Sequence, residues 1–314
     1  LVFSRACGHV IAMAQAFPQP AQNTDNLSGI LWMLFSMATF AAGDVGIKLL
    51  AGVMPPGQIM GSLGLLGTAL FAAWTKARGL TVLPPALLHP AVAMRYISEI
   101  VAGCGMVLAL TLTPLSLVTA ILQAAPLVVA MGAALVFGER VGWRRWSAIL
   151  IGLAGVLIIL RPGLAGFDPN AIWAVIAMLG LASRDLATRA CPKSLSSLQL
   201  STFGISALIP TGAILLVFTG APVAAPLQAW AILLGTILAT LVGYYAITAA
   251  MRVGEVAAVT PFRYSRLIFG LILGIAIFAE RPDAATYLGA ALILGTGLYS
   301  AWREHRARAT LPRC

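Results

Sequence analysis

The chain alternates between long runs of apolar residues and short segments that contain proline, glycine or charged residues. The apolar runs are about twenty residues long, the length that a helix needs to cross a hydrocarbon core of roughly 30 Å. Backbone polar groups in a bilayer must be hydrogen-bonded within the protein, which favours helices. The pattern therefore predicts an all-α integral membrane protein with ten transmembrane helices, at residues 28–50, 57–75, 91–111, 115–137, 145–160, 169–190, 198–219, 227–250, 256–279 and 285–302.

The composition also indicates a membrane protein. Hydrophobic residues make up 60% of the 314 residues and charged residues 10%, and the mean hydropathy is +0.94. A soluble domain carries about 25% charged residues. In a soluble protein the net charge of +10 would suggest a nucleic-acid partner. Here the basic residues lie mostly in short connections between apolar runs, so we expect no nucleic-acid partner.

The positions of lysine and arginine predict the orientation in the membrane, because these residues are enriched in cytoplasmic connections. With a cytoplasmic N-terminus, the outer connections contain only Arg161 and Arg281. The inner connections and the C-terminal tail then contain the following basic residues: Lys76, Arg78, Arg140, Arg144, Arg145, Arg189, Lys193, Arg252, Arg303, Arg306, Arg308 and Arg313. We therefore predict a multi-pass protein of the cell inner (plasma) membrane with both termini cytoplasmic.

The two halves of the chain match each other at a fixed displacement of 141 residues. The matching pairs are Trp32 and Trp173, Asp44 and Asp185, Lys48 and Arg189, Gln58 and Gln199, Phe137 and Phe278, and Glu139–Arg140 and Glu280–Arg281. Each half contains five predicted helices, so the second half would enter the membrane from the opposite side. Two inverted five-helix repeats around a central cavity are typical of secondary transporters that work by alternating access.

These boundaries divide the chain into four segments. We predict a cytoplasmic N-terminal tail at 1–27, repeat one at 28–163, repeat two at 164–304 and a basic cytoplasmic tail at 305–314. The first segment faintly resembles a signal peptide. Its apolar stretch is short and two prolines follow it, which favours the interpretation as a tail.

The ends of the two halves share a further pattern. In residues 126–162 and 261–304, a helix ends in Phe-small-Glu-Arg and a glycine-bearing helix follows. With the two five-helix repeats, this pattern resembles the drug/metabolite transporter superfamily in its ten-helix EamA-type branch, over about residues 28–304. The resemblance implies that helices one, three, four, six, eight and nine line the cavity. It also implies export of amino acids, including aromatic ones, or transport of other small metabolites, drugs or nucleotide-linked compounds.

Two acid–base pairs repeat within the predicted helices. Asp44 and Lys48 lie four residues apart on one face of the first helix, and Asp185 and Arg189 repeat this spacing in the sixth. An ionisable residue within a span costs about 2.5–3.5 kcal/mol on insertion, so each pair requires a reason. Two interpretations stay open. The pairs are anchors at the helix ends, or they form a gate that breaks and re-forms during transport.

Glu99 and Arg263 are predicted at similar depths, each about 12 Å from the inner end of its helix at 1.5 Å per residue. They could form an interhelical ion pair, with Arg95 as a competitor for the carboxylate. Glu99 is also our candidate proton carrier if transport is proton-coupled, because a carboxylate in a low-dielectric cavity can bind a proton.

Arg266 is predicted near the middle of the ninth helix, with no acidic residue close by on that helix. Within the predicted spans the bases outnumber the acids: Lys48, Arg95, Arg184, Arg189, Arg263 and Arg266 against Asp44, Glu99 and Asp185. An excess of guanidinium groups favours a substrate with a carboxylate or phosphate, which arginine binds bidentately. Arg266 is therefore the predicted anion anchor. The alternatives are a pair with Asp44 or contacts to backbone carbonyls at a helix break.

Polar and aromatic side chains at similar depths complete the predicted substrate site. With Arg266 and Glu99, its members are Arg263, Tyr264, Gln123, Tyr96 and Tyr244. Each of these side chains could instead serve packing alone. Pro126 and Pro261 lie within the fourth and ninth predicted helices, where each removes a backbone hydrogen bond and permits a kink beside the cavity.

Other classes of protein fit the sequence poorly. The three histidines lie in tails or a connection, the four cysteines are scattered singly, and no HExxH or GxSxG occurs. We therefore expect no enzyme, no metal and no cofactor. The predicted function is export of small carboxylate-bearing metabolites, with amino acids first. Multidrug or cationic-compound efflux and exchange of organic anions or phosphorylated metabolites are the alternatives. The expected partners are a small-molecule substrate, a proton as the candidate coupling ion and membrane lipid, with the protein a monomer or a weak dimer.

Overall fold

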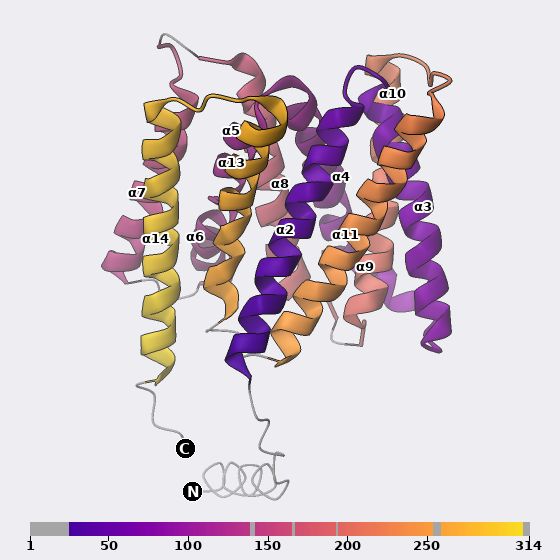
Figure 1. Ribbon diagram of the computed structural model, residues 1–314. Helices are drawn as coiled ribbons and strands as arrows, with labels where there is room; N and C mark the ends of the chain where they lie inside the picture. The colour runs from indigo at the N-terminus through magenta and orange to yellow at the C-terminus, as the bar shows by residue number, and fades with distance from the viewer. Residues whose placement is uncertain (1–24, 139–141, 165–166, 193, 254–258, 310–314) are drawn as a thin grey trace, which may run out of the picture.

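The computed structural model describes residues 25–138, 142–164, 167–192, 194–253 and 259–309. The described part is all-helical, without strands (Figure 1). Its α-helices are α2 Asn26–Leu50, α3 Pro56–Ala77, α4 Pro90–Leu112, α5 Leu115–Leu122, α6 Ala125–Phe137, α7 Trp143–Leu160, α8 Ile172–Arg189, α9 Ser197–Ser206, α10 Leu208–Thr219, α11 Leu227–Val253, α13 Ser265–Phe278 and α14 Ala284–Ala309. Short 3₁₀ turns are η1 Pro85–Leu88, η2 Pro169–Ala171 and η3 Thr260–Tyr264.

Each of the ten predicted spans corresponds to a helical segment of the structure. Within the described residues, nine segments are long and apolar enough to cross a membrane, and Trp146–Leu160 of α7 is a shorter apolar helix. The all-α membrane fold is therefore confirmed. At the C-terminal end, α14 continues to Ala309, so the segment predicted as a tail from residue 305 begins as helix. Alanine and arginine, which alternate there, both favour helix.

Proline interrupts three of the spans. The fourth span is split into α5 and α6 at Gln123 and Ala124, just before Pro126, as the sequence predicted. Proline has no N–H to donate to the carbonyl four residues earlier, so the helix breaks there. The seventh span is also split, into α9 and α10 at Ala207, a break that we did not predict although Pro210 follows it. The ninth span enters α13 through η3, which contains Pro261.

The helices pack mainly in four pairs: α2 with α11, α4 with α8, α3 with α10, and α7 with α14 (Figure 1). At a displacement of 141 residues, α2 corresponds to α8 and α4 corresponds to α11. The pair of α2 and α11 therefore corresponds to the pair of α8 and α4. The same displacement exchanges the members of the other two pairs. This exchange of packing partners is what the predicted duplication requires, while the inverted orientation across the membrane stays a prediction.

Small residues allow the closest of these contacts. A Cβ atom at Gly212 of α10 would overlap the backbone of Gly61 of α3, so these two helices touch backbone to backbone. On α13, a Cβ at Gly270 would overlap Thr119 of α5. These glycines therefore serve packing within one chain.

The short helix α5 lies at the centre of the largest hydrophobic core. Every residue of α5 except Leu117 is buried. The helices α2, α6, α8 and α13 all contact it or the core around it. The start of α2 and the end of α14 lie at the same end of the bundle, at the bottom of Figure 1. The buried helix α5 therefore contacts helices from both halves of the chain.

Candidate substrate-binding site

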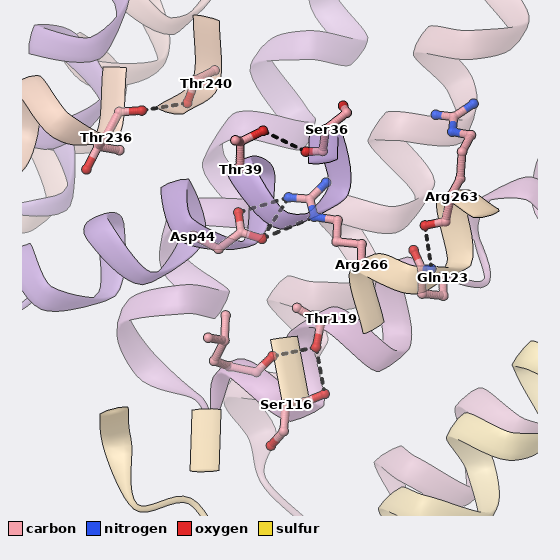
Figure 2. Close-up of polar contacts among 11 residues, drawn as sticks. Ser36, Thr39, Asp44, Ser116, Thr119, Gln123, Thr236, Thr240, Arg263 and Arg266 are labelled. Atoms are coloured by element: carbon pink, nitrogen blue, oxygen red, sulfur yellow. Dashed lines mark hydrogen bonds and ion pairs between the residues drawn. The ribbon is translucent and has the colours of Figure 1, made fainter. Parts of the chain in front are cut away.

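Asp44 of α2 and Arg266 of α13 form a bidentate ion pair inside the bundle (Figure 2). The Arg266 Nη2 atom lies 2.9 Å from Oδ1 and 2.8 Å from Oδ2 of Asp44, and its Nε lies 3.2 Å from Oδ2. The Asp44 side chain is only 5% exposed. The guanidinium also lies over the ring of Phe40, 5.5 Å from its centre. A buried ion pair requires such complete geometry, because both charges lose their hydration.

This ion pair overturns the prediction that Asp44 pairs with Lys48. The spacing of four residues would allow that pair, but the planar guanidinium from α13 binds both oxygens of Asp44 in a fixed geometry, and Lys48 is bound elsewhere. Among the alternatives for Arg266, the structure shows the pair with Asp44. In this conformation the Arg266 guanidinium is therefore engaged by the protein itself, and the predicted anion anchor is occupied.

Lys48 instead belongs to a polar network at the end of α2. Its Nζ donates to the backbone oxygen of Thr113 at 2.5 Å and lies 3.6 Å from Oε1 of Glu280. The Glu280 carboxylate, only 9% exposed, accepts the backbone N–H groups of Leu115 at 2.6 Å and Ser116 at 2.9 Å. A carboxylate at a helix N-terminus satisfies unpaired donors and complements the helix dipole. Glu280 thus binds the start of α5 and Lys48 at once.

Sequence reasoning did not assign Glu280 a role in the site. The available signal was the Phe-small-Glu-Arg sequence that closes each half. Nothing in that local pattern indicates that its glutamate binds the start of another helix. The counterpart residue, Glu139, lies outside the described residues.

A second group of charges joins α4 to α8. Arg184 donates from Nε and Nη2 to Oδ1 of Asp185 at 3.0 and 2.8 Å, and its Nη1 lies 3.5 Å from Oε1 of Glu99. The other Glu99 oxygen, Oε2, is buried and has no hydrogen-bond partner in the part of the chain that the structure describes. Asp185 is far more accessible than its counterpart Asp44, with a side chain 38% exposed.

The predicted ion pair between Glu99 and Arg263 is wrong, because Glu99 contacts Arg184. Depth along the membrane can be estimated from residue counts, but it does not say which helices are neighbours. In the structure α4 packs along α8, which carries Arg184, and not along α13. The predicted competitor Arg95 donates elsewhere, to the Thr188 hydroxyl and the backbone oxygen of Leu200, both at 3.0 Å.

Arg263 lies in η3, opposite the break between α5 and α6. Its backbone oxygen accepts a hydrogen bond of 3.2 Å from Nε2 of Gln123, and its guanidinium extends away from that contact (Figure 2). No carboxylate among the described residues lies within 4 Å of this guanidinium, and the residue is exposed. Arg263 is therefore an exposed cation next to the break between α5 and α6, without a carboxylate contact in the described part of the chain.

Aromatic rings lie beside these charges. Tyr244 of α11 packs edge-on against Phe40 and Phe71, with ring centres 5.4 and 5.9 Å apart. Tyr96 packs against Phe203 at 4.5 Å. Tyr244 is thus one ring away from the Arg266 guanidinium, through Phe40, and its part in substrate binding stays a prediction.

The remaining predicted residues lie elsewhere. Tyr264 is buried against Gly297 of α14, where a Cβ would overlap its ring, so it serves packing. Arg189 is exposed at the end of α8. Among the described residues, no group of three or more His, Cys, Asp or Glu side chains could hold a metal ion.

The sequence model of the EamA-like transporter family matches residues 27–161 and again residues 169–300. The chain belongs to this family. It is therefore a multi-pass membrane transporter of the drug/metabolite transporter superfamily. The family model matches once in each half of the chain, on either side of the connection between α7 and α8.

Curated proteins similar to this EamA-like chain include transporters and an exporter. The S-adenosylmethionine uptake transporter of Rickettsia prowazekii is 23% identical over 293 residues, 90% of this chain and 96% of that protein. The riboflavin transporter of Rhizobium johnstonii is 30% identical over 201 residues, 63% of this chain and 65% of that one. The pseudopaline exporter CntI of Pseudomonas aeruginosa is 25% identical over 278 residues, 85% and 93% of the two chains.

A solved crystal structure also resembles this EamA-like chain. It covers 90% of this chain and 99% of its own, with a TM-score of 0.59 and 20% sequence identity. At that identity the likeness shows the fold alone.

Proposed function

We propose that this transporter exports small carboxylate-bearing metabolites across the bacterial inner membrane, with amino acids and their derivatives as the first substrate class. The observation that carries the proposal is the Arg263 guanidinium, which is exposed beside the break between α5 and α6 and has no carboxylate contact among the described residues. A guanidinium in a low-dielectric site binds a substrate carboxylate through two parallel hydrogen bonds. In this role Arg263 replaces Arg266, whose guanidinium is held by Asp44.

The charges of Glu99, Asp185 and Arg184, taken together with Arg263, favour a zwitterion over a simple organic anion. Glu99 and Asp185 share the single guanidinium of Arg184, so one negative charge exceeds the positive charge between them. The charges of these three side chains and Arg263 sum to zero. A zwitterionic substrate would keep the net charge of the site at zero. A simple anion would leave an uncompensated charge in a low-dielectric site, which costs free energy. Its ammonium group would bind Oε2 of Glu99 and the open oxygen of Asp185.

The rings around Tyr244 and the named relatives support a substrate with an aromatic or heteroaromatic group. The ring of Phe40 lies against the Arg266 guanidinium and packs edge-on against Tyr244. S-adenosylmethionine, the compound named for one relative, joins an amino-acid group to a heteroaromatic ring, and riboflavin contains such a ring. An aromatic amino acid combines the same elements.

Alternating access fits the way the two halves are joined. Asp44, Lys48 and α5 belong to the first half of the chain, and their partners Arg266 and Glu280 belong to the second. Movement of α2 and α5 against α13 would break these polar contacts between the halves. In this proposal the contacts around Glu280 hold one end closed, and the pair of Asp44 and Arg266 closes the interior of the bundle.

Counterflow in proteoliposomes tests the proposal. The panel contains the twenty amino acids, S-adenosylmethionine, organic phosphates and cationic dyes. We expect exchange of at least one zwitterion, with 3-phenylpropionate and phenethylamine exchanging poorly if phenylalanine is the substrate. Exchange of cationic dyes alone would indicate drug efflux, and exchange of organic phosphates alone would indicate an organic-anion carrier. A panel without zwitterion exchange overturns the proposal.

A further inference from the structure

The helices α7 and α14 form an outer pair at one edge of the bundle (Figure 1). They touch where Gly155 of α7 faces Gly289 of α14, because a Cβ on either residue would overlap the backbone oxygen of the other. Toward the start of α7 and the end of α14 the helices separate, and a Cβ at Gly295 would meet no atom within 4 Å. The separation leaves a groove between two otherwise tightly packed helices.

This α7–α14 groove has a volume of about 390 Å³. Residues that line it include Trp143, Arg144, Ser147, Ile151, Thr296 and Tyr299. The polar and aromatic members lie toward the ends of the two helices, and the apolar member Ile151 lies two turns further in. Ile151 is 48% exposed and its neighbour Leu150 is 59% exposed, so the inner part of the groove opens onto an apolar outer surface. In a bilayer that surface contacts acyl chains.

The mouth of the α7–α14 groove is basic and aromatic. Arg144 is exposed and lies over the ring of Trp143 at 5.3 Å, and no carboxylate within the described ranges approaches its guanidinium within 4 Å. Tyr299 packs against Trp302 at 6.1 Å one turn beyond the groove. Tryptophan and tyrosine gather at the level of lipid headgroups, so the mouth lies at the membrane–water interface.

The sequence that enters α7 and leaves α14 adds positive charge at this end. It contains Arg140, Arg144, Arg145, Arg303, Arg306 and Arg308, against Glu139 and Glu304. Arginine clusters next to a span attract anionic lipid headgroups, and basic pockets between transmembrane helices bind them. A second copy of this chain is a poorer occupant. In a two-fold symmetric dimer the same surface of each copy forms the contact, so the arginines of the two copies would repel each other.

We propose that the α7–α14 groove binds one anionic phospholipid, whose phosphate contacts Arg144 and whose acyl chain lies against Ile151 and Gly295. The rings of Trp143 and Tyr299 flank the headgroup on either side. This site is separate from the charged residues inside the bundle, and it holds whether or not the transported substrate is a zwitterion.

Native mass spectrometry of the delipidated full chain in detergent tests this site. The probes are phosphatidylglycerol and phosphatidylcholine with identical acyl chains, added one at a time. We expect tighter binding of phosphatidylglycerol, and Arg144→Gln should weaken that binding about fivefold, the contribution of one basic side chain at a lipid surface. The matched control is Arg281→Gln, which removes another exposed arginine in the connection between α13 and α14. It should leave binding unchanged.

A second variant probes the acyl-chain part of the α7–α14 groove. Gly295→Leu places a side chain in open space within a helix, which favours folding, and fills the groove. It should reduce binding of phosphatidylglycerol while the melting temperature is retained. Equal losses in Arg144→Gln and Arg281→Gln overturn the proposal, because binding would then depend only on net charge. Unchanged lipid binding in Gly295→Leu overturns it as well. So does a spectrum in which the unaltered protein is a dimer without bound lipid and the variants are monomers.

Discussion

The carboxylate of Asp44 accepts three hydrogen bonds from the guanidinium of Arg266, which lies 222 residues further along the chain. This contact joins the first long helix of the first half to the ninth span, deep inside the bundle. Both charges are shielded from water, so each depends on the other for its compensation.

We predict that Asp44→Asn destabilises the protein by about 3–5 kcal/mol, because it leaves the Arg266 charge buried without a counter-charge. Thermal unfolding in detergent measures the change. The double variant Asp44→Asn/Arg266→Gln removes both charges and should recover more than half of the lost stability. Equal stability of Asp44→Asn and the unaltered protein would contradict the buried pair. A double variant that is less stable than Asp44→Asn alone would do the same.

Glu280→Gln should weaken the closed end of the bundle. The amide keeps one acceptor oxygen but loses the charge that binds two backbone N–H groups of α5 and pairs with Lys48. Hydrogen bonds to a charged group contribute about 1.5–3 kcal/mol, so we expect a loss in that range. Hydrogen exchange of the amides at Leu115 and Ser116 should accelerate specifically. Asp168→Asn, which keeps a side-chain oxygen at the start of η2, is the control and should leave these amides protected.

Arg263→Gln should reduce zwitterion exchange tenfold to hundredfold, the equivalent of about 1.5–3 kcal/mol for a hydrogen bond to a charged group. Arg263→Lys should recover part of the exchange, because it restores the charge without the bidentate geometry. Counterflow rates over a range of substrate concentrations measure both effects. Arg281→Gln again serves as the control. Full exchange in Arg263→Gln would remove this residue from the substrate site.

Glu99→Gln should impair recognition of the substrate ammonium group and not of its carboxylate. Removal of the negative charge beside Arg184 should lower phenylalanine exchange, if phenylalanine is the substrate, relative to exchange of 3-phenylpropionate. The ratio of the two rates is the measurement. Asp25→Asn removes a carboxylate at the start of α2 while keeping a good N-cap, so it should leave the ratio unchanged. An unaltered ratio in Glu99→Gln would place the ammonium group elsewhere.

Asp283, at the entrance to α14, links stability to pH outside the membrane-spanning segments. Hydrogen bonds from Arg161 and then from Thr286 lower the pKa of its carboxyl from 3.8 to about 2. The resulting stabilisation is present above pH 3.8 and is lost as the pH falls toward 2. The side chain is 49% exposed, so screening limits the effect to below about 1 kcal/mol. Asp283→Asn should therefore lower the melting temperature slightly at pH 7 and not at pH 2. An equal effect at both values would contradict the linkage.

The order and type of the helices follow from the sequence by itself. An apolar run of bilayer length is stable in lipid as a helix, because a helix forms all of its backbone hydrogen bonds internally. The ten spans could therefore be predicted from local pattern alone. The break before Pro126 was predictable for a similar reason, because a missing N–H acts within one turn of the helix. The 141-residue displacement identified the related positions Asp44 and Asp185 without any knowledge of their surroundings.

Which charges meet was decided by the tertiary structure. Spacing placed Lys48 within reach of Asp44, and depth placed Arg263 level with Glu99, but neither quantity says which faces of two helices turn toward each other. Packing of α13 on α2 brought Arg266 to Asp44, and packing of α4 on α8 brought Arg184 to Glu99. A charge in a low-dielectric interior binds the partner that offers the most complete geometry, and for Asp44 that partner is 222 residues away in the chain.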